Sequence, residues 1–228
     1  MEQTEIELTE RAIKLLRDKP SNQRVLIGLA GSPGSGKSTM SSNVTDRINK
    51  KFGEEISIVL DQDGYHYTRE ELSKFPDPEL AFKRRGAPFT FNPKGFLDLI
   101  HELQKPITTE SKDILAPSFN HKKKDPEPNS RRITPQHRII IIEGNYVLLR
   151  DEYWKEISKI VDEKWKIKVD PINARRRIIK RHLEAGISAS EEEAIERCDN
   201  NDMVNAVYIS ENSVEPDLII DSIDEIQG

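Results

Sequence analysis

Residues 25–39 read Val25-Leu26-Ile27-Gly28-Leu29-Ala30-Gly31-Ser32-Pro33-Gly34-Ser35-Gly36-Lys37-Ser38-Thr39 and contain the most specific motif of the sequence. The first six are an apolar run that predicts a buried strand, and a glycine-rich turn and the start of a helix follow them. The spacing from Gly31 to Ser38 is G-x-x-x-x-G-K-S, the pattern of a phosphate-binding P-loop. Strand, loop and helix come in the order that this motif requires, so we favour the motif over a chance match.

The chemistry of a P-loop predicts the role of each part of this stretch. Its glycines let consecutive backbone N–H groups point at phosphate oxygens, and the positive end of the new helix adds to that field. Residues 31–39 are therefore expected to bind ATP, with Lys37 bridging the β- and γ-phosphates and the Ser38 hydroxyl holding Mg²⁺.

The composition narrows the class of protein. The 228 residues hold 35 Lys+Arg and 40 Asp+Glu, a formal charge of −5, which argues against a general nucleic-acid binder. The single cysteine, Cys198, excludes an internal disulfide, fits a reducing compartment and is expected to be an ordinary helix residue. No apolar run approaches the roughly 20 residues of a membrane span. The N-terminus lacks a targeting pattern. We therefore expect a cytoplasmic protein without a membrane partner.

Strand and helix signals alternate along the chain and predict an α/β protein with a parallel sheet. Residues 138–144, Arg-Ile-Ile-Ile-Ile-Glu-Gly, are the most apolar strand, and a continuous run of this kind is typical of a parallel strand buried on both faces. Further strands are predicted at 56–60, 164–170 and 217–221, and helices at 4–19, 37–50, 94–104, 171–185 and 190–202. The length fits one domain over residues 1–228, with two small domains as the alternative.

Carboxylates follow two of the predicted strands. Asp61 and Asp63 follow the strand 56–60, which we expect beside the P-loop strand, and Glu143 ends the strand 138–144. Ligands of parallel α/β sheets bind at the carboxyl ends of strands, so these side chains are candidates for the acceptor site and the metal site. Turn or cap residues are the alternative reading for all three. Spacing does not choose between Asp61 and Asp63, although Gly64 favours Asp63 because glycine permits a sharp turn.

The region 65–135 is predicted to hold short helices and loops inserted over the site. Its aromatic residues between 65 and 96 could line an acceptor pocket or form a small satellite core, and the Arg84-Arg85 pair could serve the site or be solvated. Two short strands are expected at 114–119 and 133–134, with a solvated lysine run at 122–124 and a Pro/Asn-rich loop at 125–130 between them.

The helix predicted at 171–185 is rich in cations. Arg177 and Arg181 lie one helical turn apart, so they share a face that could clamp phosphates, bind nucleic acid or be solvated; the acidity of the chain weakens the second reading. The next helix is predicted to begin with a capping box of Ser190 and Glu193.

These motifs resemble the phosphoribulokinase/uridine kinase family, which includes the bacterial pantothenate kinase type. The resemblance covers about residues 23–222 and rests on the P-loop, on Asp61-Gln62-Asp63-Gly64-Tyr65-His66, on residues 84–91 and on Ile142-Glu143-Gly144-Asn145-Tyr146. Residues 201–206, Asn-Asp-Met-Val-Asn-Ala, are similar to a branch described as fructose-transport-type kinases. The resemblance implies a P-loop NTP hydrolase fold with helices on both faces of the sheet. It also implies acceptor-binding insertions within 65–135 and a small lid at 175–190, whereas the helix that the apolar pattern predicts within 1–22 lies outside the resemblance.

The resemblance also implies roles by position. Asp63 would be the catalytic Asp that orients or deprotonates the acceptor hydroxyl, Lys37 would hold the ATP phosphates, and Ser38 and Glu143 would serve the metal. Arg177 and Arg181 would close on the transferring phosphoryl group. Tyr65, Arg85 and the hairpin residues Phe119 and His121 would touch the acceptor. With Asp63 as the base, Asp61 would hold an acceptor hydroxyl, bind a metal-bound water or cap the turn. Asn92 stands where pantothenate kinases usually have Asp, and Gly64-Tyr65-His66 departs from the Ser-Phe-Tyr of uridine kinases; both leave the acceptor open.

The predicted function is transfer of the ATP γ-phosphoryl group to an alcohol of a small metabolite, with nucleosides, pantothenate-like compounds and sugars all open as acceptors. The alternative is a nucleotide-binding regulatory switch without kinase activity. That reading needs a guanine-reading Asn-Lys-x-Asp after a later strand, and the sequence has none. A homodimer is left open.

Overall fold

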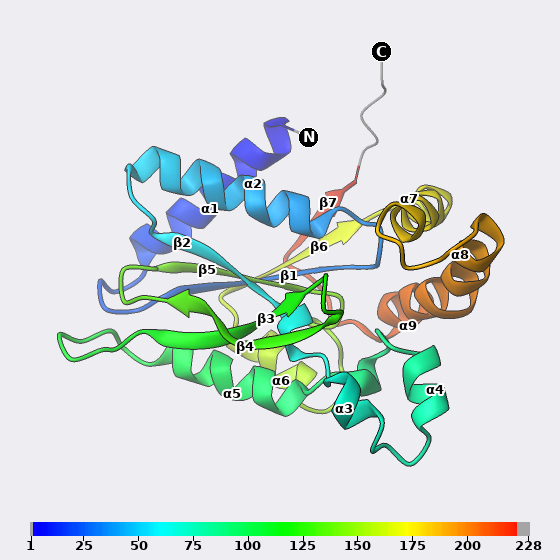
Figure 1. The fold of residues 1–228 in the computed structure, drawn as a ribbon. Helices are drawn as coiled ribbons and strands as arrows, with labels where there is room; N and C mark the ends of the chain where they lie inside the picture. Colours follow the sequence, from blue (N-terminus) through cyan, green and yellow to red (C-terminus); the bar gives the residue numbers. More distant parts are fainter. Residues whose placement is uncertain (1, 223–228) are drawn as a thin grey trace.

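The computed structural model describes residues 2–222, which form an α/β fold around a five-stranded sheet (Figure 1). All neighbouring strands of this sheet are parallel. Their order is β2 (Ser57–Asp61), β5 (Ile139–Gly144), β1 (Val25–Gly31), β6 (Glu163–Lys168) and β7 (Leu218–Asp221). The α/β class and the parallel sheet predicted from the sequence are therefore confirmed.

Helices cover both faces of the sheet, as predicted. Figure 1 shows α1 (Glu2–Asp18) and α2 (Lys37–Phe52) on one face, and α5 (Pro93–Gln104) and α6 (Trp154–Ile160) on the other. Successive side chains of a strand point to opposite faces, so the four isoleucines of β5 are divided between two cores. Ile139 and Ile141 pack under α1 and α2, whereas Ile140 and Ile142 pack against α5 and α6. This burial on both faces fixes the central position of β5.

The position of β2 corrects an expectation. We expected this strand beside the P-loop strand, but β5 lies between them and pairs with both. The burial of the strands gives the reason. Every residue of β5 is buried, which suits an inner strand, whereas three of the five residues of β2 are half-buried, which suits the edge.

The inserted region contains α3 (Arg69–Leu72), α4 (Pro78–Lys83), 3₁₀ turns at Gln62–Tyr65 and Pro88–Thr90, and a hairpin of β3 (Ile114–Asn120) and β4 (Asp125–Ile133). The Pro/Asn-rich stretch 125–130, predicted as a loop, belongs to β4. Pro126 and Pro128 are tolerated because a two-stranded sheet consists only of edge strands. The aromatic group is also divided, since Tyr65, Phe91 and Phe96 join the core under α5, whereas Phe82 and Phe89 are exposed.

The chain after β6 forms α7 (Pro171–Glu184), α8 (Glu191–Arg197), a π-helical turn (Cys198–Asp202) and α9 (Met203–Asn212). The single helix predicted at 190–202 is therefore a helix that ends in a π-turn. Ser190 caps α8 by accepting from the Glu193 N–H, but the Glu193 carboxylate accepts from the Ala189 N–H rather than from Ser190, so half of the predicted capping box forms. Cys198 is buried in this segment, as an ordinary helix residue would be.

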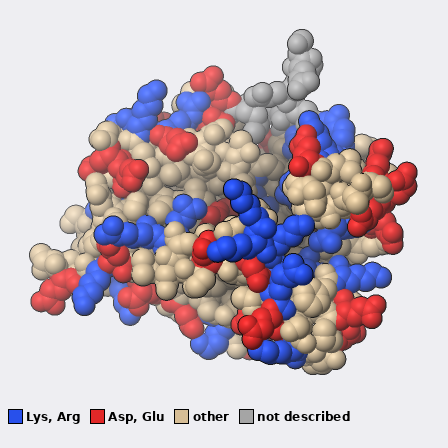
Figure 2. Space-filling view, in the orientation of Figure 1, with Lys and Arg blue, Asp and Glu red and all other residues tan. Residues whose placement is uncertain are grey.

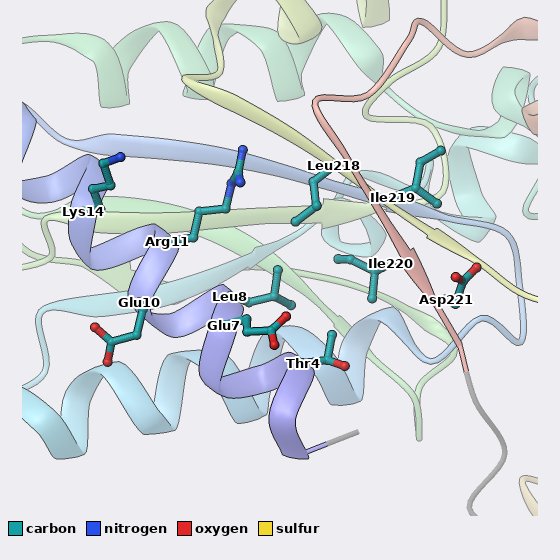
Figure 3. Close-up of a pocket in the computed structure, with 10 residues that line it drawn as sticks. All are labelled: Thr4, Glu7, Leu8, Glu10, Arg11, Lys14, Leu218, Ile219, Ile220 and Asp221. Carbon is teal, nitrogen blue, oxygen red and sulfur yellow. The ribbon is translucent and has the colours of Figure 1, made fainter.

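A cavity of about 590 Å³ lies between α1 and the outer strand β7 (Figure 3). Its walls are Leu8 and the charged side chains of α1 on one side and residues 218–221 on the other, and the P-loop is not among its lining residues. None of the helices within residues 2–222 combines the length and the apolar character that crossing a bilayer requires.

Candidate active site

The P-loop connects β1 to α2 with the geometry that phosphate binding needs. Gly34 and Gly36 have φ angles of 75° and 87°, in the left-handed region that favours glycine. A Cβ on Gly34 would also lie 2.7 Å from the carbonyl oxygen of Ala174. Gly36 supplies no side chain to cap α2, so the N–H groups of the first turn are left for an anionic ligand.

Ser38 and Glu143 meet beside this helix N-terminus. The Ser38 hydroxyl lies 3.0 and 3.1 Å from the two carboxylate oxygens of Glu143, whose side chain comes from the end of β5. Glu143 is only 4% exposed, and burial raises its pKa to about 7; Lys37 opposes this rise, whereas Asp61 and Asp63 add to it. A buried carboxylate with too little positive charge around it fits a bound cation.

The donor set fits Mg²⁺ rather than a metal held by protein ligands alone. A hydroxyl and a carboxylate are hard oxygen ligands, and Mg²⁺ is usually held by one or two carboxylates together with substrate phosphates and waters. Within residues 2–222 no cluster of three or more His, Cys, Asp or Glu residues could hold a metal by itself. Ser38 and Glu143 are thus the residues that would hold the ion, with ATP completing its coordination.

Asp61 and Asp63 have different environments although they are two residues apart. Asp61 is the register partner of Glu143, and its Oδ2 accepts from Nη2 of Arg131 on β4 at 2.9 Å. Burial raises the pKa of Asp61, and Arg131 opposes that rise. Asp63 lies in the 3₁₀ turn that follows, and no hydrogen bond or ion pair with another residue of the described range engages its carboxylate.

Gly64 holds this turn close to the hairpin, which differs from the reason predicted for it. Its φ lies outside the left-handed region, so the turn itself does not require glycine. A Cβ at this position, however, would lie 2.3 Å from the carbonyl oxygen of Pro117 and 2.7 Å from its carbonyl carbon. Close approach of β3 to the turn is therefore what excludes a side chain here.

Replacing Gly64 with alanine is expected to lower the free energy of unfolding by about 1–3 kcal/mol, because rigid backbone must move to admit a methyl group. The matched control is Gly28→Ala on β1, where the nearest atoms to a Cβ are side-chain carbons at 3.4 Å or more. Urea unfolding of both variants measures the difference. A smaller loss for Gly64→Ala than for Gly28→Ala would contradict the contact with β3.

Arg85 is held by the protein itself. Its Nη1 donates to the carbonyl of Lys124 at 2.6 Å, and its Nη2 donates to Asp125 at 2.7 Å and to the carbonyl of Tyr67 at 3.1 Å. Its guanidinium also lies 5.7 Å from the centre of the Phe119 ring. Arg85 therefore ties the tip of the β3–β4 hairpin to the rest of the inserted region.

Residues 201–206, Asn-Asp-Met-Val-Asn-Ala, contact the inserted region at Arg84 and Arg85. Arg84 donates to Asn201 Oδ1 at 3.0 Å and to Asn205 Oδ1 at 3.1 Å, and Asn201 Nδ2 donates to the carbonyl of Arg85 at 3.1 Å. Both asparagines are buried. The motif was noted in the sequence, but its two asparagines could be assigned as partners of residues 84–85 only from the structure, because more than a hundred residues separate them along the chain.

The remaining predicted acceptor residues lie at different depths. The Phe119 ring packs 5.0 Å from His66 and 5.3 Å from His121, and His121 is exposed at the hairpin tip. Tyr65 is buried in the core, 4.7 Å from the Phe96 ring, and this burial raises the pKa of its phenol. The structure thus brings Phe119 and His121 together and directs the Tyr65 ring into the core.

The predicted lid helix, α7, contacts the P-loop. Arg177 Nη1 donates to the carbonyl of Gly34 at 3.1 Å and to the Ser222 hydroxyl at 2.8 Å, whereas Arg181 is exposed. Lys124 at the hairpin tip reaches the carbonyl of Gly186 beyond α7 at 3.4 Å. Figure 2 shows basic side chains gathered in this part of the surface, where the hairpin tip in Figure 1 approaches α7 and α8.

Comparison with known proteins finds one family and several similar structures. The model of the phosphoribulokinase/uridine kinase family matches residues 26–225. A Schizosaccharomyces pombe protein named "Putative uridine kinase C227.14" is 44% identical over 217 residues, which are 95% of this chain and 90% of that protein. The crystal structure of a "putative fructose transport system kinase" from Silicibacter sp. TM1040 has a TM-score of 0.80 and 28% identity, over 93% of this chain and 98% of that one. The YFH7 structure from Saccharomyces cerevisiae has a TM-score of 0.86 at 24% identity, over 97% and 99% of the two chains, and indicates a shared fold.

Proposed function

The chain belongs to the phosphoribulokinase/uridine kinase family, and from this premise we propose that it transfers the γ-phosphoryl group of ATP to an alcohol of a small metabolite. The observation that carries the proposal is the grouping of Ser38 with Glu143 at the P-loop, with Asp61 and Asp63 at the end of the neighbouring strand. Phosphate-binding groups and a potential base for a hydroxyl thus lie at one edge of the sheet.

In the proposed reaction the oxygen of the acceptor hydroxyl forms a bond to the γ-phosphorus, and the bond from that phosphorus to the β–γ bridging oxygen breaks. ADP leaves with the electron pair of the broken bond. Asp63 orients the hydroxyl and takes its proton, because its carboxylate has no competing partner in residues 2–222. The backbone N–H groups of the P-loop and Lys37 bind the phosphates, and Ser38 and Glu143 hold Mg²⁺. When bound, the cation neutralises charge on the β- and γ-phosphates.

The test is ADP release with ATP and a panel of small alcohols, measured by a coupled assay. We expect ADP release that depends on the acceptor and on Mg²⁺, together with a thermal shift that is larger with ATP than with GTP. A protein that binds nucleotide but releases no ADP with any alcohol would contradict the kinase proposal and favour a nucleotide-binding switch.

Replacing Arg177 or Arg181 of the predicted lid with alanine is expected to have different effects on kcat and on the melting temperature. Arg181→Ala should lower kcat by about tenfold or more while leaving the melting temperature nearly unchanged, because an exposed side chain contributes little to folding. Arg177→Ala should lower both, since it also removes the hydrogen bond to the Gly34 carbonyl. Steady-state kinetics and thermal unfolding of the pair give the comparison. A normal kcat in Arg181→Ala would remove it from the phosphoryl-binding set.

A further inference from the structure

A polar groove of about 410 Å³ runs along β2, beside α2. Ser38 and Asp61 line it, so the groove is continuous with the candidate active site. Ser41, Ser42, Thr45, Asp46 and Asn49 of α2 form one wall. Glu55, His137 and, from β4, Arg131 also line the groove, and Arg131 is bound to Asp61. A ligand whose hydroxyl is held at Asp63 therefore has room to extend past Asp61 along β2.

The groove offers hydrogen-bonding groups that the fold leaves unused. Strand β2 ends the sheet, and its outer edge pairs with no strand in residues 2–222. Asn49 of α2 binds the backbone N–H and C=O of Ser57 at that edge, so the edge groups left to a ligand are those of Val59, the next residue of β2 that points the same way.

Arg131 differs from the other arginines that face the acceptor side. Arg84 is held by two asparagines, and Arg85 is held by Asp125 and two carbonyls. The Arg131 side chain, in contrast, makes one hydrogen bond within residues 2–222, from Nη2 to Asp61, and is 38% exposed. Its remaining N–H donors lie in a planar fork that matches a carboxylate or a phosphate.

The charges around the candidate site indicate which kind of acceptor Arg131 would bind. Asp61, Asp63 and Glu143 are three carboxylates at this end of the sheet. Arg131 is paired with Asp61 and Glu143 is assigned to Mg²⁺, so Asp63 is the carboxylate left to repel an anionic acceptor. Lys37 is expected to be occupied by the ATP phosphates. A neutral alcohol would not need a further cation beside Asp61, whereas an acidic acceptor would.

We propose that Arg131 determines acceptor specificity by binding an anionic group, so that the acceptor is a hydroxylated acid whose carboxylate or phosphate lies beside Arg131, at the Asp61 end of the groove. Arg131 then bridges Asp61 and the ligand, and Asp61 holds the guanidinium in place. The inference rests on the proposed kinase function, because it concerns the second substrate of that reaction.

The test uses pairs of acceptors that differ in one charged group: glycerate and glycerol, pantothenate and pantothenol, and gluconate and glucose. Glycerol 3-phosphate is added to distinguish a phosphate from a carboxylate. ADP release is measured for each compound with saturating MgATP. We expect the acidic member of at least one pair to be the better acceptor by at least tenfold in kcat/KM.

Arg131→Ala should then raise KM for that acid by about 10- to 100-fold, the loss expected for a charge-assisted hydrogen bond, and leave KM for ATP unchanged. Arg131→Lys should recover part of the loss because it keeps the charge and loses the fork. The matched control is Arg132→Ala, which removes an arginine paired with Asp113 at the next position of β4. Thermal unfolding of each variant establishes that the hairpin is intact.

Three outcomes would overturn the inference. If the neutral compound is the better acceptor in every active pair, the anionic-acceptor inference is contradicted, whereas the proposed kinase function is not. An equal loss in Arg131→Ala and Arg132→Ala, or an Arg131→Ala loss confined to kcat and shared by neutral and acidic acceptors, would assign Arg131 a structural role. ADP release with no compound of the wider alcohol panel would instead contradict the proposed function itself.

Discussion

Lys37→Ala is expected to reduce kcat/KM by about a hundredfold or more, because removing one charged group that stabilises a phosphoryl transition state has a cost of this order. Lys37 is the first residue of α2, and its charge already acts on the buried Glu143 carboxylate. The variant therefore loses the proposed contact with the β- and γ-phosphates and also leaves Glu143 with less positive charge around it. Weaker ATP binding should accompany the loss of rate.

The matched control for this variant is Lys50→Ala, which removes the same side chain from the last turn of the same helix. It should retain normal kinetics. Isothermal titration with a non-hydrolysable ATP analogue separates binding from rate, and circular dichroism reports whether both variants fold. Near-normal activity in a folded Lys37→Ala protein would contradict the assignment of residues 31–39 as the ATP-binding loop.

The parts of the fold that were predicted correctly depend on local patterns. The run before Gly31, the glycine spacing and the apolar strand at 138–144 each carry their signal within a few residues, and the structure forms β1, α2 and β5 there. Strand order could not be predicted in the same way. Residues 56–60 alone do not predict whether β5 or β1 is their neighbour, because that pairing depends on burial over the whole sheet.

In the candidate site, too, some residues could be predicted from local motifs and others could not. Ser38 and Glu143 could be named because each follows a strong local motif, and the structure places them in hydrogen-bond contact. Arg131 was missed because the prolines of 125–130 indicated a loop, and because its partner Asp61 lies 70 positions away along the chain. The pairing of Asn201 and Asn205 with Arg84 is equally non-local. Side chains that meet only through tertiary packing leave no periodic signal in the sequence.

The choice of catalytic base between Asp63 and Asp61 can now be argued from their surroundings. Asp61 is bound to Arg131, which engages its carboxylate and orients it toward the groove. The Asp63 carboxylate has no such partner in residues 2–222, and its turn is held against β3 by the close approach at Gly64. A base must be free to accept a proton, so we propose Asp63 rather than Asp61 for this role.

Asp63→Asn is therefore expected to lower kcat by about a hundredfold or more while ATP still binds, since the amide keeps the shape and cannot take a proton. Asp61→Asn should instead raise KM for the acceptor and change kcat little, because it loosens Arg131 without removing the base. Steady-state kinetics with acceptor and ATP varied separately distinguish the two. If Asp61→Asn loses kcat and Asp63→Asn changes only KM, then Asp61 is the base, and Arg131 acts by orienting that base rather than by binding the acceptor.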